Sequence, residues 1–109
     1  MRKFIVGSEW VSYKLYMGTK TADSFIKTEL HNIINKLNNK IIINNWFFIR
    51  FYDTDFHIRL RIQLCDVKYL NVVVKEVYNI VNPLVDENLI HRVQIDTYSR
   101  ELERYGKKT

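Results

Sequence analysis

The sequence predicts an α+β protein with the ferredoxin-like order β-α-β-β-α-β, a four-stranded antiparallel sheet with two helices on one face. Three observations lead to this fold class. Four segments have the alternation or the β-branched and aromatic content of strands. Two longer segments repeat apolar residues at the helical period. The length of 109 residues suits a single domain, 1–109, built around one core.

The first strand and helix are expected in the N-terminal third. Residues 10–16 are aromatic and β-branched, and Gly18 closes the predicted strand. The segment 21–38 then follows the helical period closely, with Thr21 as a suitable N-cap, so we expect one continuous helix. Its apolar positions are Ala22, Phe25, Ile26, Leu30, Ile33, Ile34 and Leu37.

The middle of the chain is predicted to form a hairpin. Residues 46–52 and 57–64 are the two strands, and Asp53-Thr54-Asp55 is the turn between them. Along the second strand, isoleucine and leucine alternate with His57, Arg59, Arg61 and Gln63. Side chains alternate between the two faces of a strand, so the apolar set must meet the helices and the polar set must lie on the open face. Arg59 and Arg61 are therefore expected about 7 Å apart on that face.

A second helix and a fourth strand complete the predicted fold. Residues 67–81 have valines at helical spacing, and Asp66 is a candidate cap. The alternative for the valine-rich middle of this segment is a strand, because β-branched residues also suit a strand. The Asn82-Pro83 pair is expected to end this helix, because proline breaks a helix interior. Residues 90–95 are the fourth strand.

Composition limits the classes of function. The net charge of +5 favours an anionic partner, although a mildly basic protein without a polyanionic partner is an equal alternative. The single cysteine, Cys65, excludes an internal disulfide and is expected to be a small buried apolar residue. No segment approaches the ~18 apolar residues of a membrane span, and the N-terminal apolar stretch is too short for a signal peptide. We therefore expect a cytoplasmic protein.

The arginines are the candidate functional groups. Guanidinium groups bind carboxylates and phosphates through paired hydrogen bonds, so Arg59 and Arg61 on a rigid strand suit an oxyanion. The alternative is that they are solvated charges, or that they pair with Asp53, Asp55, Glu101 or Glu103. The three glycines form no phosphate-binding cluster. No metal site or catalytic triad is indicated, so we expect no metal and no cofactor.

RNA binding is a weaker alternative. The common RNA-recognition module has the same topology and stacks bases on aromatic residues of its central strands. Here the third predicted strand has no aromatic side chain on its open face, and it lacks the glycines of that module's consensus. Direct contact with tRNA is therefore not expected.

Three blocks of sequence resemble a known family. They are residues 8–16, residues 46–53 together with 57–61, and residues 94–106. In this order and spacing, which spans almost the whole chain, they are similar to the C-terminal domain of lantibiotic dehydratases and related thiopeptide-type bacteriocin biosynthesis proteins. Some cyclisation enzymes of thiopeptide pathways also resemble this family.

The resemblance implies β-elimination. In such enzymes a separate domain uses glutamyl-tRNA to glutamylate serine or threonine of a precursor peptide. The elimination domain then removes glutamate and leaves dehydroalanine or dehydrobutyrine. The family's elimination arginines correspond by motif to Arg59, Arg61 and Arg100, the expected catalytic residues. We expect His57, Tyr98 and Arg104 to bind the substrate.

The resemblance also implies a partial domain. The family's domain is more than twice as long, and its catalytic histidine lies in a later segment. We therefore expect a fragment, a small stand-alone homologue or half of a split protein, with lyase activity when that C-terminal segment is supplied. The expected partners are a ribosomal precursor peptide, a glutamylating dehydratase domain or other biosynthetic proteins, and a second copy bound through an exposed strand edge. The alternative is a non-catalytic module that binds the precursor peptide or a partner protein.

Overall fold

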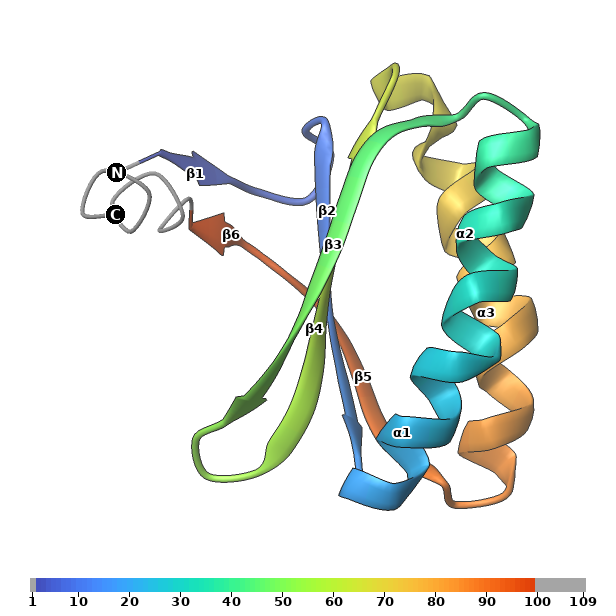
Figure 1. The fold of residues 1–109 in the computed structure, drawn as a ribbon. Helices are drawn as coiled ribbons and strands as arrows, with labels where there is room; N and C mark the ends of the chain where they lie inside the picture. Colours follow the sequence, from blue (N-terminus) through green and yellow to red (C-terminus); the bar gives the residue numbers. More distant parts are fainter. Residues whose placement is uncertain (1, 100–109) are drawn as a thin grey trace.

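The computed structural model describes residues 2–99, which form a mixed α and β fold with helices on one side of a sheet (Figure 1). The long strands are β2 (Trp10–Met17), β3 (Ile43–Tyr52), β4 (Phe56–Leu64) and β5 (Ile90–Asp96). The helices are α1 (Thr19–Lys27), α2 (Glu29–Asn39), the short 3-10 helix η1 (Val67–Tyr69) and α3 (Leu70–Asp86). Two short strands, β1 (Lys3–Phe4) and β6 (Tyr98–Ser99), pair with each other.

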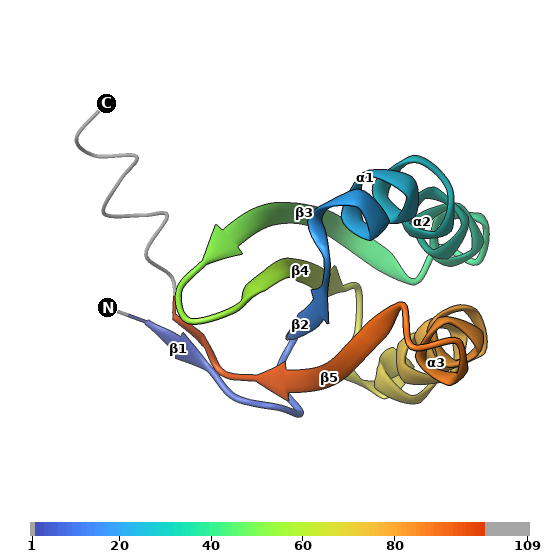
Figure 2. The same cartoon turned by 90° about the horizontal axis from the view of Figure 1, so that it is seen from below.

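The four long strands form one antiparallel sheet in the order β3-β4-β2-β5. The α+β class is thus confirmed, and β2 and β4 lie in the middle of the sheet. Figure 2 shows α1 and α2 next to the β3 side of the sheet and α3 next to the β5 side. Within the described residues, β3 and β5 each pair along one edge only, and dimerisation through such an edge stays a prediction.

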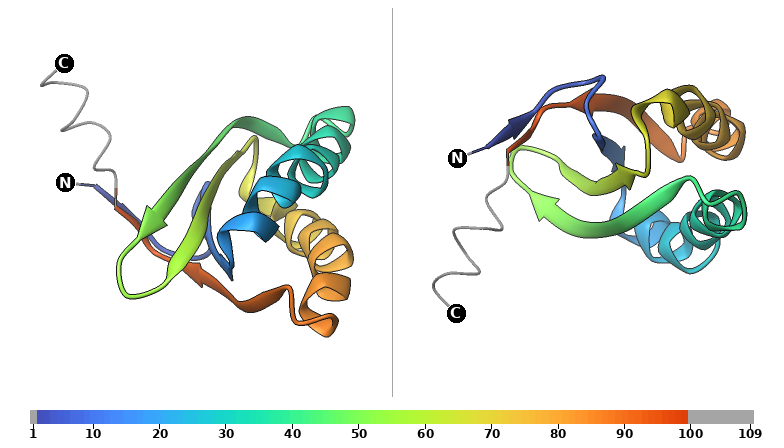
Figure 3. Two further views of the ribbon diagram at one scale, coloured as in Figure 1. Left: turned by 60° about the horizontal axis from the view of Figure 1, so that its bottom comes forward. Right: turned by 90° about the horizontal axis from the view of Figure 1, so that it is seen from above.

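The second face of the sheet is not fully open as expected. The β1–β6 ladder lies on the side away from the helices, and Figure 3 shows its two strands side by side there. Phe4 of β1 and Tyr98 of β6 pack with Trp10 into a small aromatic cluster, against which Phe47 lies. Part of the predicted open face is therefore buried.

The predicted first helix is divided at Thr28, whose φ of −120° and ψ of −72° separate α1 from α2. Thr28 still donates to the Ser24 carbonyl and accepts from the Asn32 N–H, both at 3.1 Å, so hydrogen bonding continues through the break. His31 Nδ1 donates to the Ile26 carbonyl at 2.8 Å, which satisfies an acceptor at the break. The apolar residues of both helices still face the core.

The predicted end of the second helix at Asn82-Pro83 is wrong, because α3 continues through Pro83 to Asp86. Proline loses one backbone hydrogen bond there, but the extra turn packs Leu84 and Val85 against the core. Two residues past the last helical residue, Asp86, Asn88 has a φ of 62°. The Leu89 N–H donates to the Leu84 carbonyl at 2.9 Å, the bond of a Schellman motif.

The main core lies between the helices and one face of the sheet. Its fully buried members on the central strands include Leu15, Ile58, Leu60 and Ile62. The expectation that Cys65 is buried is wrong: it follows the end of β4, is exposed, and donates from Sγ to Asn44 Oδ1 at 3.1 Å. Among residues 2–99, no helix has the length and apolar character needed to cross a membrane.

Ile41→Gly is expected to stabilise the protein. Ile41 lies two residues past the end of α2 and has a φ of 55°, a region that β-branched residues disfavour. Its side chain is 77% exposed. Glycine relieves the backbone strain with little loss of burial, so the free energy of unfolding should rise by about 1 kcal/mol in urea denaturation. Asn88→Gly at the equivalent end of α3 is the matched control. It should change stability by only a few tenths of a kcal/mol, because asparagine tolerates this conformation. A fall in stability for Ile41→Gly would contradict the assignment of strain.

Candidate functional site

The helix-free face of the central strands carries the predicted arginines. In the pairing of β2 with β4, Lys14 lies opposite Arg59 and Ser12 opposite Arg61. On its other side, Lys14 lies opposite Gln94 of β5. Alternation along each strand places these side chains on one face, opposite the isoleucines and leucines of the core.

A pocket of about 430 Å³ opens over these strands. Lys14, Arg59 and Arg61 line it together with Asp96, and the remaining lining residues are Lys3, Ile5, Thr97 and Ser99. The pocket therefore collects four basic side chains and one carboxylate, and it extends from the sheet to the β1–β6 ladder. The structure brings Arg59 and Arg61 to one site, as the sequence predicts.

Arg61 is more buried than the prediction of an open face implies, with only 9% of its surface exposed. Its guanidinium carbon lies 4.7 Å from the Tyr98 ring centroid and 5.8 Å from that of Phe47. Its Nε donates to Ser12 Oγ at 3.5 Å. Tyr98, expected to bind substrate, is itself 1% exposed and packs on Arg61. The aromatic cluster thus holds Arg61 in place, and a cation against aromatic faces is stabilised there.

Arg59 is half-buried and has different supports. Its guanidinium carbon lies 3.6 Å from the centroid of the Phe51 ring. Its Nε donates to His57 Nε2 at 3.1 Å. His57 is 0% exposed and lies beneath Arg59 rather than at the pocket surface.

Lys14 and Asp96 are two site residues that were not expected from the sequence. Lys14 Nζ lies 3.0 Å from Asp96 Oδ2. The hydrogen bond from Lys14, with the Thr97 backbone N–H and the charges of Lys14 and Arg59, lowers the pKa of Asp96 below its ordinary value. Asp96 therefore stays ionised at neutral pH. The signal that could have found Lys14 is that it is the single charged residue of a central strand whose other residues, apart from Ser12, are aromatic or apolar.

Two predicted site residues, Arg100 and Arg104, lie outside the described residues. Among residues 2–99, no three His, Cys, Asp or Glu side chains are grouped closely enough to hold a metal ion. The described part of the site can therefore bind and orient an anion with fixed cations, as oxyanion recognition requires.

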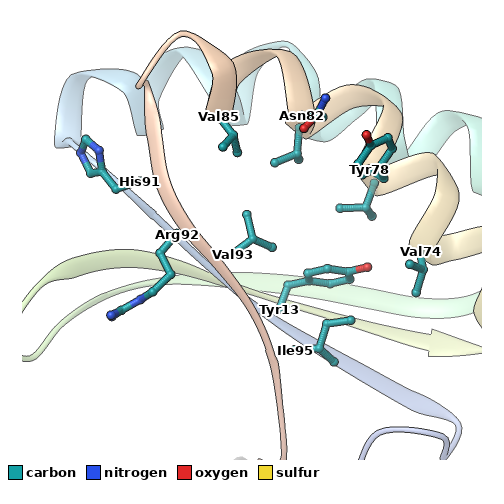
Figure 4. Close-up of a pocket in the computed structure, with 11 residues that line it drawn as sticks. Tyr13, Val74, Tyr78, Asn82, Val85, His91, Arg92, Val93 and Ile95 are labelled. Carbon is teal, nitrogen blue, oxygen red and sulfur yellow. The ribbon is translucent and has the colours of Figure 1, made fainter.

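A second, apolar pocket of about 470 Å³ lies between α3 and β5 (Figure 4). Val93 and Ile95 of β5 line it with Tyr13, and α3 contributes Val74 and Tyr78 across from them. Burial raises the pKa of Tyr13 to about 12, because the phenolate loses its hydration. Tyr13 is thus neutral in the folded protein at any physiological pH.

The raised pKa of Tyr13 predicts a loss of stability at alkaline pH. The stabilising contribution of Tyr13 is complete below the unfolded pKa of about 10. It is lost as the pH rises toward 12, because in this range the unfolded state releases the Tyr13 proton while the folded state keeps it. Two pKa units correspond to about 3 kcal/mol. Urea denaturation of wild type and Tyr13→Phe between pH 9 and about pH 12 isolates this contribution, because the other tyrosines are common to both proteins. Parallel pH profiles for the two proteins would contradict the burial of the hydroxyl group.

The sequence is similar to known proteins over most of its length. Residues 10–109 match the family described as "Lantibiotic biosynthesis dehydratase C-term". The chain is 31% identical over 102 residues to nisin biosynthesis protein NisB of Lactococcus lactis subsp. lactis, covering 91% of this chain and 10% of NisB. It is 29% identical over 98 residues to subtilin biosynthesis protein SpaB of Bacillus subtilis, covering 90% of this chain and 9% of SpaB. The chain thus spans about a tenth of the length of these relatives.

The fold is also similar to that of a solved structure. The tRNA-dependent lantibiotic dehydratase MibB from Microbispora sp. 107891 superposes with a TM-score of 0.82 and 22% identity. The match covers 97% of this chain and 10% of MibB. The similarity is therefore to one part of a much larger protein.

Proposed function

Since the chain belongs to the family of lantibiotic biosynthesis dehydratase C-terminal domains, we propose that it takes part in dehydrating a bacteriocin precursor peptide. The proposed reaction is elimination of glutamate from glutamylated serine or threonine, which gives dehydroalanine or dehydrobutyrine. The names of the nisin and subtilin biosynthesis relatives support a ribosomal precursor peptide as substrate. A separate domain would supply the glutamylated residue.

The bond changes define what the site must do. A base removes the Cα proton of the glutamylated residue, and the electron pair forms the Cα=Cβ double bond. The Cβ–O bond breaks, and glutamate leaves with the electron pair of that bond on its carboxylate. Negative charge thus develops first on the enolate-like group and then on the leaving carboxylate. Fixed cations that face this charge lower the barrier.

The pocket residues suit these tasks. We assign the departing carboxylate to the guanidinium of Arg59, and the enolate-like charge to the more buried Arg61. Lys14 suits the side-chain carboxylate of the glutamyl group. The Asp96 carboxylate, ionised in the same pocket, suits an ion pair with the free α-ammonium group of the glutamyl ester.

The other predicted residues have supporting roles in this proposal. Tyr98 holds Arg61 through its ring. Arg100 and Arg104 follow β6 in the sequence, and we propose that they contribute further cations from that segment. We assign the base to a C-terminal segment of the kind that the family resemblance implies.

The observation that carries the proposal is the convergence of Lys14, Arg59 and Arg61 on one pocket from two adjacent strands. Like charges on neighbouring strands repel one another, so three of them are costly unless an anion or a carboxylate such as Asp96 offsets them. A rigid sheet also holds the three groups at fixed separations. Such pre-organisation is what stabilisation of a developing anion requires.

The test is an elimination assay on a chemically glutamylated serine peptide, followed by mass spectrometry. The chain is incubated alone and with the remaining C-terminal segment of a lantibiotic dehydratase elimination domain added in trans. Loss of glutamate to give dehydroalanine is expected when the segment is present. The same peptide with unmodified serine is the control and should keep its mass.

If the glutamylated peptide binds but keeps its mass in both mixtures, the chain is a non-catalytic peptide-binding module and the elimination proposal is wrong. The RNA alternative is tested by measuring binding of the chain to tRNA at several salt concentrations. An RNA-binding domain would bind tRNA with a steep salt dependence, and a flat salt dependence would rule this alternative out.

A further inference from the structure

We propose that His57 is a positioning residue, which fixes the guanidinium of Arg59 for the anion and does not contact the substrate. The inference rests on the proposed function for the identity of that anion. It replaces the expectation that His57 binds substrate directly, because the His57 side chain has no exposed surface.

Two hydrogen bonds define the state of the His57 ring. Arg59 Nε lies 3.1 Å from His57 Nε2, and an arginine Nε–H can only donate, so Nε2 must be unprotonated. His57 Nδ1 lies 3.1 Å from the Asp55 carbonyl oxygen, which can only accept, so Nδ1 must carry the hydrogen. Together the bonds select the neutral ring with hydrogen on Nδ1. A second proton would place a cation against Arg59 and remove its acceptor.

Aromatic packing fixes the same pair. The His57 ring centroid lies 4.6 Å from that of Tyr16 and 5.6 Å from that of Phe51. Phe51 also lies under the guanidinium of Arg59. One ring therefore contacts both the histidine and the arginine, and the turn carbonyl of Asp55 sets the rotation of the imidazole.

The arrangement decides which donors of Arg59 meet a ligand. Within the described residues, its one hydrogen bond to a protein atom is through Nε. The two terminal nitrogens are thus the donors that remain for an oxyanion in the pocket. Fixing the arginine before the ligand binds avoids the entropy cost of ordering a long side chain at that moment.

The inference is tested with a pair of variants of the full chain. His57→Gln keeps an acceptor at about the position of Nε2, whereas His57→Phe keeps a ring between Tyr16 and Phe51 but has no acceptor. His91→Phe on β5 is the control, because His91 is exposed and does not line the cationic pocket. Thermal unfolding of all variants checks that each is folded.

The first measurement is by NMR and does not depend on activity. In wild type the His57 ring nitrogens should show hydrogen on Nδ1 and none on Nε2, and the Arg59 Nε–H should exchange slowly with solvent. That protection should persist in His57→Gln and His91→Phe and be lost in His57→Phe. Hydrogen on Nε2 in wild type, or a protected Arg59 Nε–H in His57→Phe, would overturn the proposal.

The second measurement is kinetic, with the glutamylated peptide and the added C-terminal segment. His57→Phe should lower kcat/KM by about tenfold or more, as loss of a hydrogen bond to a charged group would. His57→Gln should restore it to within about threefold of wild type. Equal kcat/KM in His57→Phe and wild type would sink the positioning role. If wild type itself is inactive, the proposed function fails, and the NMR result still decides the role of His57.

Discussion

Arg59→Ala is expected to lower the rate of glutamate elimination by about 100-fold or more, the usual effect of removing one fixed donor to a developing anion. Arg59 is the arginine of the pocket that is half-buried, while Arg61 lies under the aromatic cluster. Its loss removes the forked donor assigned to the leaving carboxylate. Single-turnover assays with the added C-terminal segment measure this chemical step directly.

Arg59→Lys tests the geometry as well as the charge. A lysine ammonium keeps the positive charge but has no Nε–H for His57 and no planar fork for a carboxylate. Its rate should therefore stay well below that of wild type. Arg50→Gln is the matched control, because Arg50 pairs with Asp23 at 2.8 Å and does not line the cationic pocket. If Arg59→Ala weakens only peptide binding and leaves the elimination step unchanged, the chain acts as a binding module.

Leu60→Ala is expected to have the largest effect on stability, lowering the free energy of unfolding by about 3 kcal/mol. Leu60 is 0% exposed and lies opposite Tyr13 and Phe48 on the neighbouring strands. Alanine would lose this burial and leave a cavity in the centre of the sheet. Because a small domain has only about 5–15 kcal/mol to lose, the change should be plain in urea denaturation.

Leu89→Ala removes the same atoms from a site that is 39% exposed, so it should cost less than about 1 kcal/mol. Similar losses for the two variants would mean that β4 is not packed as tightly as the structure indicates. The stability of Leu60→Ala also bears on the site. Leu60 lies between Arg59 and Arg61 in the same strand, on the opposite face.

The sequence predicts the central sheet because the alternation along β4 is complete. His57, Arg59 and Arg61 fall on one face there, and isoleucine and leucine fall on the other, so only one orientation buries the apolar set. This local pattern is enough to predict which side chains lie on each face of the sheet. It therefore also predicts that Arg59 and Arg61 lie on the same face.

The β1–β6 ladder, which covers part of the sheet face away from the helices, could not be predicted in this way. β1 has only two residues, Lys3 and Phe4, too few to show a period, and its partner β6 is at the other end of the described chain. The burial of Arg61 depends on that distant pairing. Thr28 and Pro83 are further examples: α1 ends without a glycine or proline, whereas α3 passes through a proline because the packing of Leu84 and Val85 outweighs one lost hydrogen bond.

The pairing of β1 with β6 has a consequence for the order of folding. Lys3 opposite Ser99 closes a loop of almost the whole described chain, and the entropy of closing such a loop must be lost before its few contacts form. The hairpin of β3 and β4 closes over only a few residues and is expected to form early. We therefore expect the packing of the Tyr98 ring on Arg61 to be the last step of folding. Hydrogen exchange should detect it, because the amides of β1 and β6 would open locally while those of β4 remain protected until global unfolding.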